Sequence, residues 1–286
     1  MNREKRMNRR SFIKRLVAGI GGLMLFTGLD AFFIERHLLR RRDIEVPLAD
    51  MPDVFEGFRI AHFSDVHIGH GFTASDLESL VERINEAKPD MIAFTGDLVD
   101  DGMEELAATT EALARLHAPY GKYAVLGNHD VRGKAQPEQI IEAYQKAGFM
   151  PLVNQHVTIC HEDAEASFTL AGLDDNWRHP DWETTFEKRH GDGLVIALIH
   201  EPDLADRAKE YGVSLQLSGH SHGGQVRLPF VGGLLYPPYG CKYPDGLQKV
   251  EDSSMLVHTS RGIGTTILPI RFLCPPEWYI LTLRKK

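Results

Sequence analysis

Residues 58–67 read Phe-Arg-Ile-Ala-His-Phe-Ser-Asp-Val-His, a short apolar run over 58–63 that is followed by the pair Asp65 and His67. Two later apolar runs, 91–94 and 122–126, end in the same way, at Gly-Asp and at Gly-Asn-His-Asp. Runs of this length are typical of buried strands, and the spacers between them show helical spacing of apolar residues. The alternation predicts an α/β fold with a parallel sheet.

Helix signals lie between these runs. Thr73 and Asp76 form a capping pattern ahead of a helix that Pro89 ends, and Pro137 occupies the position of a first-turn proline. After residue 150 the strand-like runs outnumber helices, and they are 152–159, 168–171, 194–199, 213–217, 255–259 and 278–283. We expect one domain over residues 43–286, which is α/β first and mainly β later.

Composition excludes collagen, disordered tails and disulfide-stapled miniproteins, with 43% hydrophobic residues and three cysteines in 286 residues. The charge is divided unevenly. Residues 1–42 hold eleven Lys or Arg and three acids, a net charge of +8, whereas the remaining 244 residues carry −16. A basic head is therefore joined to an acidic body.

The head contains Asn8-Arg9-Arg10-Ser11-Phe12-Ile13-Lys14 and an apolar run over residues 16–29, and it resembles a twin-arginine export signal. No Ala-x-Ala site follows the run, so we expect a retained membrane anchor over residues 1–42, with a cleaved signal as the alternative. Seven bases precede the run and four follow it, which favours a cytoplasmic N-terminus and an exported body.

Polar side chains gather at the strand ends of the body. Asp65, Asp97 and Asn128 each follow an apolar run, and ligands of parallel α/β sheets bind at that edge. Asp65-x-His67 and His220-x-His222 have the i, i+2 spacing that points two side chains of an extended chain to one face.

Together with Asp97, Asn128 and His200 these pairs give four His, two Asp and one Asn. That is too many ligands for one tetrahedral zinc, so two divalent ions that share a carboxylate fit better. The donor set suits Mn²⁺, Fe²⁺ or Zn²⁺, and Mn²⁺ is our first expectation. The chain has fourteen His, and each motif alone is common without a metal. The prediction of a two-metal site rests on the order of these motifs and on their placement at strand ends.

The motifs Asp65-x-His67, Gly96-Asp97-x-x-Asp100, Gly127-Asn128-His129-Asp130, His200 and Gly219-His220-Ser221-His222 resemble the full signature of the calcineurin-like metallophosphoesterases, across residues 58–283. Residues 223–225 and the stretches 260–264 and 274–277 resemble a bacterial branch of membrane-associated phosphodiesterases that often carry twin-arginine signals. UDP-2,3-diacylglucosamine pyrophosphatases are related to that branch.

The resemblance implies a four-layer α/β/β/α sandwich, here preceded by an N-terminal apolar helix. It implies that Asp65, His67, Asp97 and His222 hold one ion, and that Asp97, Asn128, His200 and His220 hold the other. Asp97 would bridge the two ions and Asp100 would support the ligands from behind. The subgroup of purple acid phosphatases has Tyr in place of Asp100, which argues against that activity.

The expected chemistry is hydrolysis of a phosphodiester or pyrophosphate by a hydroxide that bridges the two ions. His129 would protonate the leaving oxygen, and Asp130 would hold its imidazole in the required tautomer. For substrate contacts the candidates are Arg261, Trp177 and Arg178, with Trp182 in the same stretch as the last two.

We expect a small-molecule or lipid-linked substrate of the cell envelope. A nuclease or cyclic-nucleotide phosphodiesterase on the same fold is the enzymatic alternative, and a non-catalytic scaffold is the other class. The −16 charge of the body counts against binding to a nucleic-acid duplex. The other expected partners are the membrane and the twin-arginine export machinery.

Overall fold

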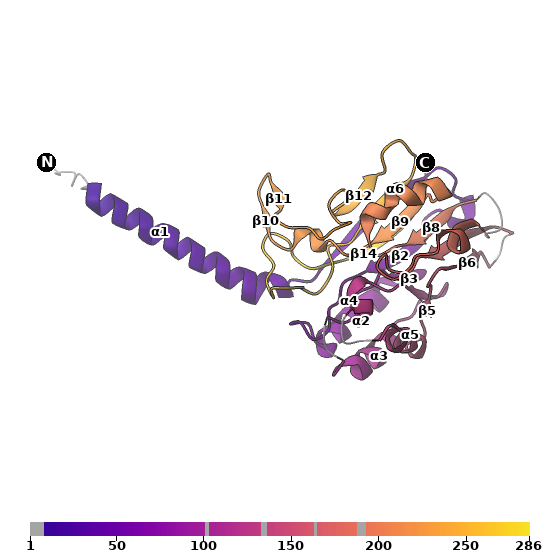
Figure 1. Cartoon of the computed structure of the whole chain (residues 1–286), viewed down its shortest axis with the longest axis horizontal. Helices are drawn as coiled ribbons and strands as arrows, with labels where there is room; N and C mark the ends of the chain where they lie inside the picture. The colour runs from indigo at the N-terminus through magenta and orange to yellow at the C-terminus, as the bar shows by residue number, and fades with distance from the viewer. Residues whose placement is uncertain (1–8, 101–102, 133–135, 163–164, 188–192) are drawn as a thin grey trace.

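The computed structural model describes residues 9–100, 103–132, 136–162, 165–187 and 193–286. Two six-stranded sheets form its centre (Figure 1). Arg3, Lys5, Arg6 and Asn8 of the basic head lie outside the described residues.

The first sheet carries the strands that the opening motif predicted. β2 to β5 are mutually parallel, and β14 runs antiparallel to β2 but parallel to β1. In spatial order the strands are β1 (Arg40–Leu48), β14 (Glu277–Lys285), β2 (Arg59–Phe63), β3 (Met91–Phe94), β4 (Lys122–Ala124) and β5 (Met150–Pro151).

The second sheet is built from the later half of the chain. Its four inner strands are parallel and its two edge strands are antiparallel to their neighbours. In spatial order they are β12 (Gly246–Lys249), β13 (Leu256–Thr259), β9 (Leu215–Ser218), β8 (Val195–Leu198), β7 (Ser167–Gly172) and β6 (Gln155–Cys160).

Three apolar layers separate the elements. Side chains alternate along each strand, so in β3 Ile92 and Phe94 pack under helices while Met91 and Ala93 pack between the sheets. The helices on the outer face of the first sheet are α2 (Ala74–Ala87), α3 (Leu106–Ala114) and α5 (Pro137–Lys146). The second sheet is covered by α6 (Ala205–Ala208) and the π-helix η4 (Glu183–Glu187). The predicted α/β/β/α sandwich is confirmed.

Local signals account for the helix ends. The Thr73 hydroxyl accepts the Asp76 N–H, and the Asp76 carboxylate accepts the Thr73 N–H in return, so the predicted capping box is present at α2. Pro137 is the first residue of α5, as predicted. The short helix expected near 203–211 is α6 with a 3-10 turn on each side, η5 (Pro202–Leu204) and η6 (Lys209–Tyr211).

Two regions differ from the sequence prediction. The strand expected over 152–159 begins only at Gln155, as β6, because the chain turns at Asn154, whose φ is 54°, and the preceding β5 (Met150–Pro151) belongs to the other sheet. Strand β1 was not expected at all. It begins at Arg40, so the boundary predicted between residues 42 and 43 falls inside it. Its first half is charged and exposed, which suits a strand at the edge of a sheet. A search for apolar runs therefore does not find this strand.

The N-terminal segment is helix α1 (Arg9–Leu29), followed by the π-helix η1 (Asp30–Ile34) and the 3-10 turn η2 (Glu35–His37). Together Arg9–His37 form a helix that is long and apolar enough to cross a membrane by length and composition. The helix extends away from the sandwich (Figure 1). Beside its junction with the body stand the hairpin strands β10 (Arg227–Leu228) and β11 (Gly232–Gly233).

Candidate metal centre

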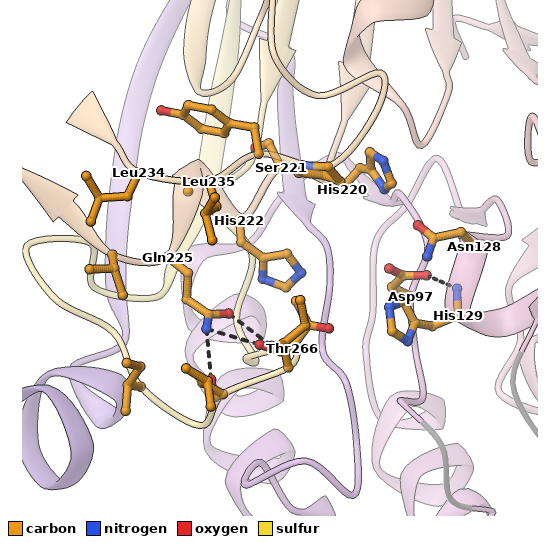
Figure 2. A pocket seen from close by; sticks show the side chains of 17 residues that line it. Asp97, Asn128, His129, His220, Ser221, His222, Gln225, Leu234, Leu235 and Thr266 are labelled. Carbon is orange, nitrogen blue, oxygen red and sulfur yellow. Dashed lines mark hydrogen bonds between the residues drawn. The ribbon is translucent and has the colours of Figure 1, made fainter. Parts of the chain in front are cut away.

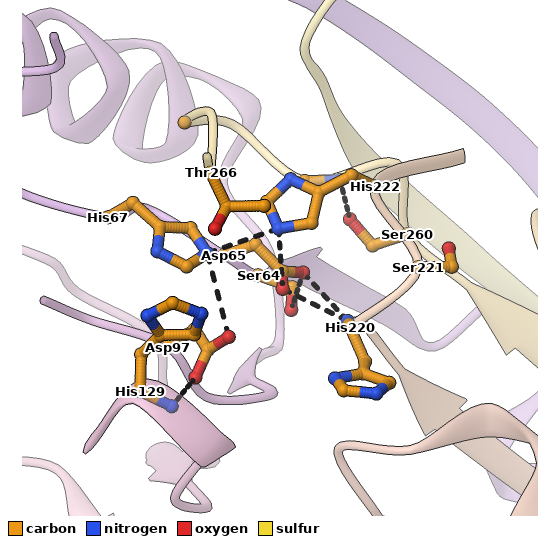
Figure 3. Close-up of polar contacts among 12 residues, drawn as sticks. Ser64, Asp65, His67, Asp97, His129, His220, Ser221, His222, Ser260 and Thr266 are labelled. Carbon is orange, nitrogen blue, oxygen red and sulfur yellow. Dashed lines mark hydrogen bonds and ion pairs between the residues drawn. The ribbon is translucent and has the colours of Figure 1, made fainter. Parts of the chain in front are cut away.

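The predicted ligands meet where strands of both sheets end. Asp65 and His67 follow β2, Asp97 follows β3, and Asn128 opens the short helix α4 (Asn128–Arg132) after β4. From the second sheet, His200 follows β8, and His220 and His222 follow β9. Figure 3 shows the side chains of Asp65, His67, Asp97, His220 and His222 gathered in one region.

Five of these residues share an uncommon backbone conformation. Asp65, His67, Asp97, His220 and His222 have φ between 48° and 69°. Left-handed φ is disfavoured for residues with a side chain, and such strain collects at functional sites. Neighbouring glycines make room for the turns: a Cβ on Gly127 would lie 2.3 Å from Asp97 Oδ1, and one on Gly219 would lie 1.8 Å from Ser64 Oγ.

One cluster of donor atoms joins Asp65, His67 and His222. The two imidazole Nε2 atoms are 3.1 Å apart, and His222 Nε2 is 3.5 Å from Asp65 Oδ1. His67 Nδ1 lies 3.1 Å from Asp100 Oδ1, so with Nδ1 as the donor its Nε2 offers a lone pair to the cluster. All three side chains are buried.

A second cluster centres on Asp97. Its Oδ2 is 3.2 Å from His200 Nε2 and 3.5 Å from His67 Nε2, so Asp97 lies between the two histidines. A group of Asp65, Asp97 and His200 has ligand atoms within 4.8 Å of one another. The carboxylate predicted to bridge two ions therefore occupies the position between the two clusters.

Unpaired buried atoms show that the residues fit a cation. Asn128 Oδ1 is buried without a hydrogen-bond partner, and burial of an unpaired carboxamide oxygen is costly. His200 Nδ1 donates to the Thr95 carbonyl at 2.6 Å, so Nε2 is the nitrogen that faces Asp97, at 3.2 Å from its Oδ2. Imidazole and oxygen donors in this arrangement suit a divalent ion such as Mn²⁺, Fe²⁺ or Zn²⁺.

The pKa values of Asp65, Asp97 and His200 are shifted by burial and by the charges of these groups on one another. Burial raises the pKa of Asp65, and burial would do so at Asp97, but the charge and hydrogen bond of His200 hold the Asp97 pKa well below its ordinary value. In turn, Asp97 raises the pKa of His200 well above its ordinary value, although burial opposes that rise. A positive charge between these groups is favourable, and a bound cation supplies one.

His220 stands at the border of the clusters. Its Nε2 donates to the Pro238 carbonyl at 2.9 Å, which leaves Nδ1 as the possible ligand atom. Its ring centroid is 5.0 Å from that of His200. Burial lowers the pKa of His220 to about 3, so the imidazole is neutral, as a metal ligand must be.

Asp100, rather than Asp130, holds the His129 ring. Asp100 Oδ1 lies 3.2 Å from His129 Nδ1 and 3.1 Å from His67 Nδ1. Burial opposes ionisation of Asp100, but these two histidines lower its pKa. Hydrogen bonding to Asp100 also raises the pKa of His129 to about 9, against the effect of burial.

The role expected for Asp130 is therefore wrong. Its carboxylate is fully buried and accepts the backbone N–H groups of Asp97, Leu98 and Gly127 at 2.9 to 3.0 Å. It fixes the loops that carry Asp97 and Asn128. Sequence reasoning placed Asp130 beside its neighbour His129, but the first turn of α4 directs the carboxylate into the protein.

Each of the suggested substrate contacts has a partner within the protein. Arg261 donates to Asp245 Oδ2 at 2.6 and 2.8 Å and lies 3.6 Å from Glu277. Arg178 Nε lies 3.6 Å from Asp174. The guanidinium of Arg132 lies over the half-exposed Trp177 ring, with its Cζ 3.4 Å from the ring centroid.

Trp182 is part of the core. It is 3% exposed and stacks on Phe186 and Tyr211, so it forms no lid over the site.

Sequence reasoning also missed two groups of the site. The Ser64 hydroxyl donates to Asp65 Oδ2 at 2.5 Å, and the Thr95 carbonyl fixes the tautomer of His200. Ser64 is adjacent to a predicted ligand, which is a usable signal. A backbone carbonyl such as that of Thr95 leaves no mark in the sequence.

Comparison with known proteins agrees with this geometry. Residues 58–224 match the family described as calcineurin-like phosphoesterase. The chain is 37% identical to the uncharacterized metallophosphoesterase YkuE of Bacillus subtilis, over 98% of this chain and 99% of the relative. It is 29% identical to phosphodiesterase YaeI of Escherichia coli, over 86% and 88% of the two chains.

A third relative is a transmembrane protein with a metallophosphoesterase domain from Danio rerio, 31% identical over 85% of this chain and 57% of the relative. The family match covers more than half of the chain and includes every predicted ligand, and the first of these relatives is similar along its whole length. The chain therefore belongs to the calcineurin-like phosphoesterases, a family of metal-dependent hydrolases of phosphoesters.

Proposed function

We propose that this chain hydrolyses phosphodiester or pyrophosphate bonds with two divalent metal ions, Mn²⁺ first among them. The observation that carries the proposal is the clustering of donor atoms of Asp65, His67, Asp97, His200 and His222 at the strand ends, with Asn128 Oδ1 buried and unpaired. The similarity to phosphodiesterase YaeI supports the choice of a diester.

The residues divide between two positions. Asp65, His67 and His222 would hold one ion, and Asn128, His200 and His220 the other. Asp97, between the clusters, would contact both. Two such ions supply charge that stabilises the phosphoryl oxygens and acidifies the attacking water.

His129 is placed to move a proton at the leaving oxygen. Its Nδ1 is held by Asp100, and its backbone N–H donates to Asp97 Oδ1 at 2.8 Å, so the ring is fixed beside the ligand cluster. The ring also lines the cavity that opens beside the ligands, where a substrate enters (Figure 2). The remaining nitrogen, Nε2, is the atom that donates.

We further propose that the body is exported by the twin-arginine route and stays at the cytoplasmic membrane through α1, where envelope phosphoesters are its substrates. The apolar helix Arg9–His37 and the similarity to a transmembrane metallophosphoesterase of Danio rerio support a membrane location.

Hydrolysis of bis-p-nitrophenyl phosphate by the full chain in detergent tests the reaction. We expect turnover with Mn²⁺, loss of turnover after treatment with EDTA, and recovery when Mn²⁺ is returned. Asp97→Asn should lose metal and activity together. Asp252→Asn is the matched control, because Asp252 is exposed and has a φ of 54°, close to the 57° of Asp97.

Full activity of the EDTA-treated chain, or of Asp97→Asn, would refute the metal-dependent mechanism. The same assay with a cyclic nucleotide and with single-stranded DNA compares the alternative substrates.

A further inference from the structure

A cavity of about 620 Å³ extends from the ligand cluster to the loop between β13 and β14. Asp97, Asn128 and His129 line one end of it (Figure 2). Its volume lies in the range of small-molecule sites, so it has room for more of a substrate than the phosphate.

The other end of the cavity is apolar. Its lining there comes from the segment after β11 and from the loop between β13 and β14, which contribute Leu234, Leu235, Ile267, Leu268 and Ile270. Gln225 holds the loop between β13 and β14, since its side chain donates to the carbonyls of Thr266 and Leu268 and accepts the Thr266 N–H. The segment after β11 is held beside Gln225, because the Leu234 N–H donates to the Val226 carbonyl at 3.0 Å. The apolar wall is thus a built part of the fold.

The outer edge of this wall exposes large apolar side chains to an unusual degree. We name it the apolar rim, and it consists of Phe230, Val231, Leu234, Leu235, Ile267 and Leu268. Leu235 is 81% exposed, Ile267 is 85% exposed, and Phe230 is as exposed as in an open chain. Large apolar side chains exposed in this way mark a surface that meets another apolar phase.

The backbone at the rim is held in a costly conformation. Ile267 has a φ of 62° and Phe230 a φ of 66°. A left-handed φ is rare for a β-branched residue, so strain is retained at a position that places an isoleucine in solvent. The Ile267 side chain is exposed, so it makes no packing contacts within the protein that would offset this strain.

The loop that carries Ile267 and Leu268 is fixed to the end of the apolar helix by the residues that follow them. The Arg271 N–H donates to the Ala31 carbonyl at 3.1 Å, and Arg36 donates to the Pro269 carbonyl at 3.3 Å. The buried Glu35 carboxylate accepts the N–H groups of Leu273 and Cys274 at 2.8 and 2.7 Å. Helix α1 and the rim therefore lie on the same side of the molecule (Figure 1).

We propose that the apolar rim rests in the membrane that α1 enters, and that the cavity takes the hydrocarbon chain of a membrane phosphoester whose phosphate reaches the ligand cluster. This inference rests on the proposed function and specifies its substrate as an amphiphile drawn from the bilayer. The occupant is a lipid surface because the exposed side chains are apolar and join a helix with the composition of a membrane span.

Two diesters with the same leaving group separate this inference from the proposed function. The full chain in nanodiscs is assayed for release of p-nitrophenolate from methyl p-nitrophenyl phosphate in solution and from hexadecyl p-nitrophenyl phosphate in the bilayer. We expect kcat/KM to favour the hexadecyl ester by at least about 10-fold, the discrimination that an apolar pocket provides.

The double variant Leu235→Ser/Ile267→Ser should reduce this preference by about 10-fold. Both side chains are exposed, so the substitutions remove no core packing. The matched control is Val54→Ser/Met150→Ser, which replaces two exposed apolar residues away from the rim and should keep both rates.

Hydrolysis of neither ester would refute the proposed function. Equal kcat/KM for the two esters, or a preference that survives Leu235→Ser/Ile267→Ser, would refute only the membrane inference. A preference seen with two chains per nanodisc and lost with one would assign the rim to a second copy, and would overturn the inference as well.

Discussion

At the residue scale, the site combines strained ligands with rigid support behind them. The left-handed backbone at Asp65 and Asp97 turns each carboxylate toward the cluster, and Ser64 and His129 N–H then hold one oxygen of each. Asp100 fixes two rings at once, those of His67 and His129. Ligand and proton donor are therefore oriented by one carboxylate.

His129→Ala tests the separation of proton transfer from metal binding. We expect the variant to keep its metal content and to lose at least about 100-fold in kcat on a diester, because a positioned general acid contributes 10²–10⁴-fold. Metal analysis by mass spectrometry and kcat for bis-p-nitrophenyl phosphate provide the two measurements.

The metal measurement is decisive because His129 also lies within 4.8 Å of donor atoms of His67 and Asp97. Loss of one metal in His129→Ala would make His129 a ligand. Full activity with full metal content would refute its role in catalysis.

At the element scale, short loops join the strand ends into one platform. Asp130 accepts N–H groups from the loop after β3 and from the loop after β4, so one buried carboxylate connects two of the ligand-bearing turns. Burial and the nearby Asp97 raise the pKa of Asp130 to about 7, which these hydrogen bonds oppose.

The main effect of Asp130→Asn should therefore be on the stability of the fold rather than on the chemical step. The amide NH₂ would face backbone donors that the carboxylate accepts, and a lost buried hydrogen bond costs about 1–3 kcal/mol. We expect a lower melting temperature, measured by calorimetry in detergent, and weaker metal binding. Asp206→Asn is the control, since that carboxylate is 40% exposed and pairs with Lys242 at 2.8 Å. An unchanged melting temperature in Asp130→Asn would contradict the role of a loop clamp.

The two sheets are joined by a buried histidine pair that titrates. His62 in β2 lies 3.0 Å from His258 in β13, between their Nδ1 atoms. Burial lowers the pKa of His258 from an ordinary 6.5 to about 3, and it lowers that of His62 as well. Between about pH 6.5 and pH 3, His258 therefore binds a proton in the unfolded chain but not in the folded chain.

Stability from His258 is thus present above pH 6.5 and is lost as the pH falls toward 3, by about 2 kcal/mol at pH 5. His258→Gln should show a smaller drop in unfolding free energy between pH 7 and pH 5, measured by urea denaturation. The exposed His117 supplies the control His117→Gln, which should keep the wild-type drop. A His258→Gln drop equal to that of the wild type would contradict this assignment.

At the scale of the whole molecule, the basic head and the acidic body meet at β1. Arg42 donates to Glu277 at 2.9 Å and the Arg41 guanidinium lies over the Trp278 ring, so part of the basic segment is packed onto β14. The last residues of the basic head are in this respect part of the first sheet, since β1 begins at Arg40. The ligand cluster, although set in a body of charge −16, is where positive charge is expected to bind.

Much of the site was predictable from sequence because the signal is local. A short apolar run followed at once by Asp65, Asp97 or Asn128 identifies a strand end, and the i, i+2 pairs identify chelating side chains. The strands β2, β3, β7 and β8 were predicted within one residue at each end for the same reason. Their apolar residues face two cores, so they read as unbroken runs.

What the sequence determined by itself is the fold class, the candidate ligands and the apolar helix, since each depends on residues close together in the chain. Tertiary structure alone decided that Asp100 holds His129, that Arg261 is neutralised by Asp245, that β1 completes the first sheet, and that the apolar rim adjoins α1. These are contacts between distant segments. Their free energy depends on which surfaces packing brings together. The spacing of residues along the chain does not predict which surfaces those are.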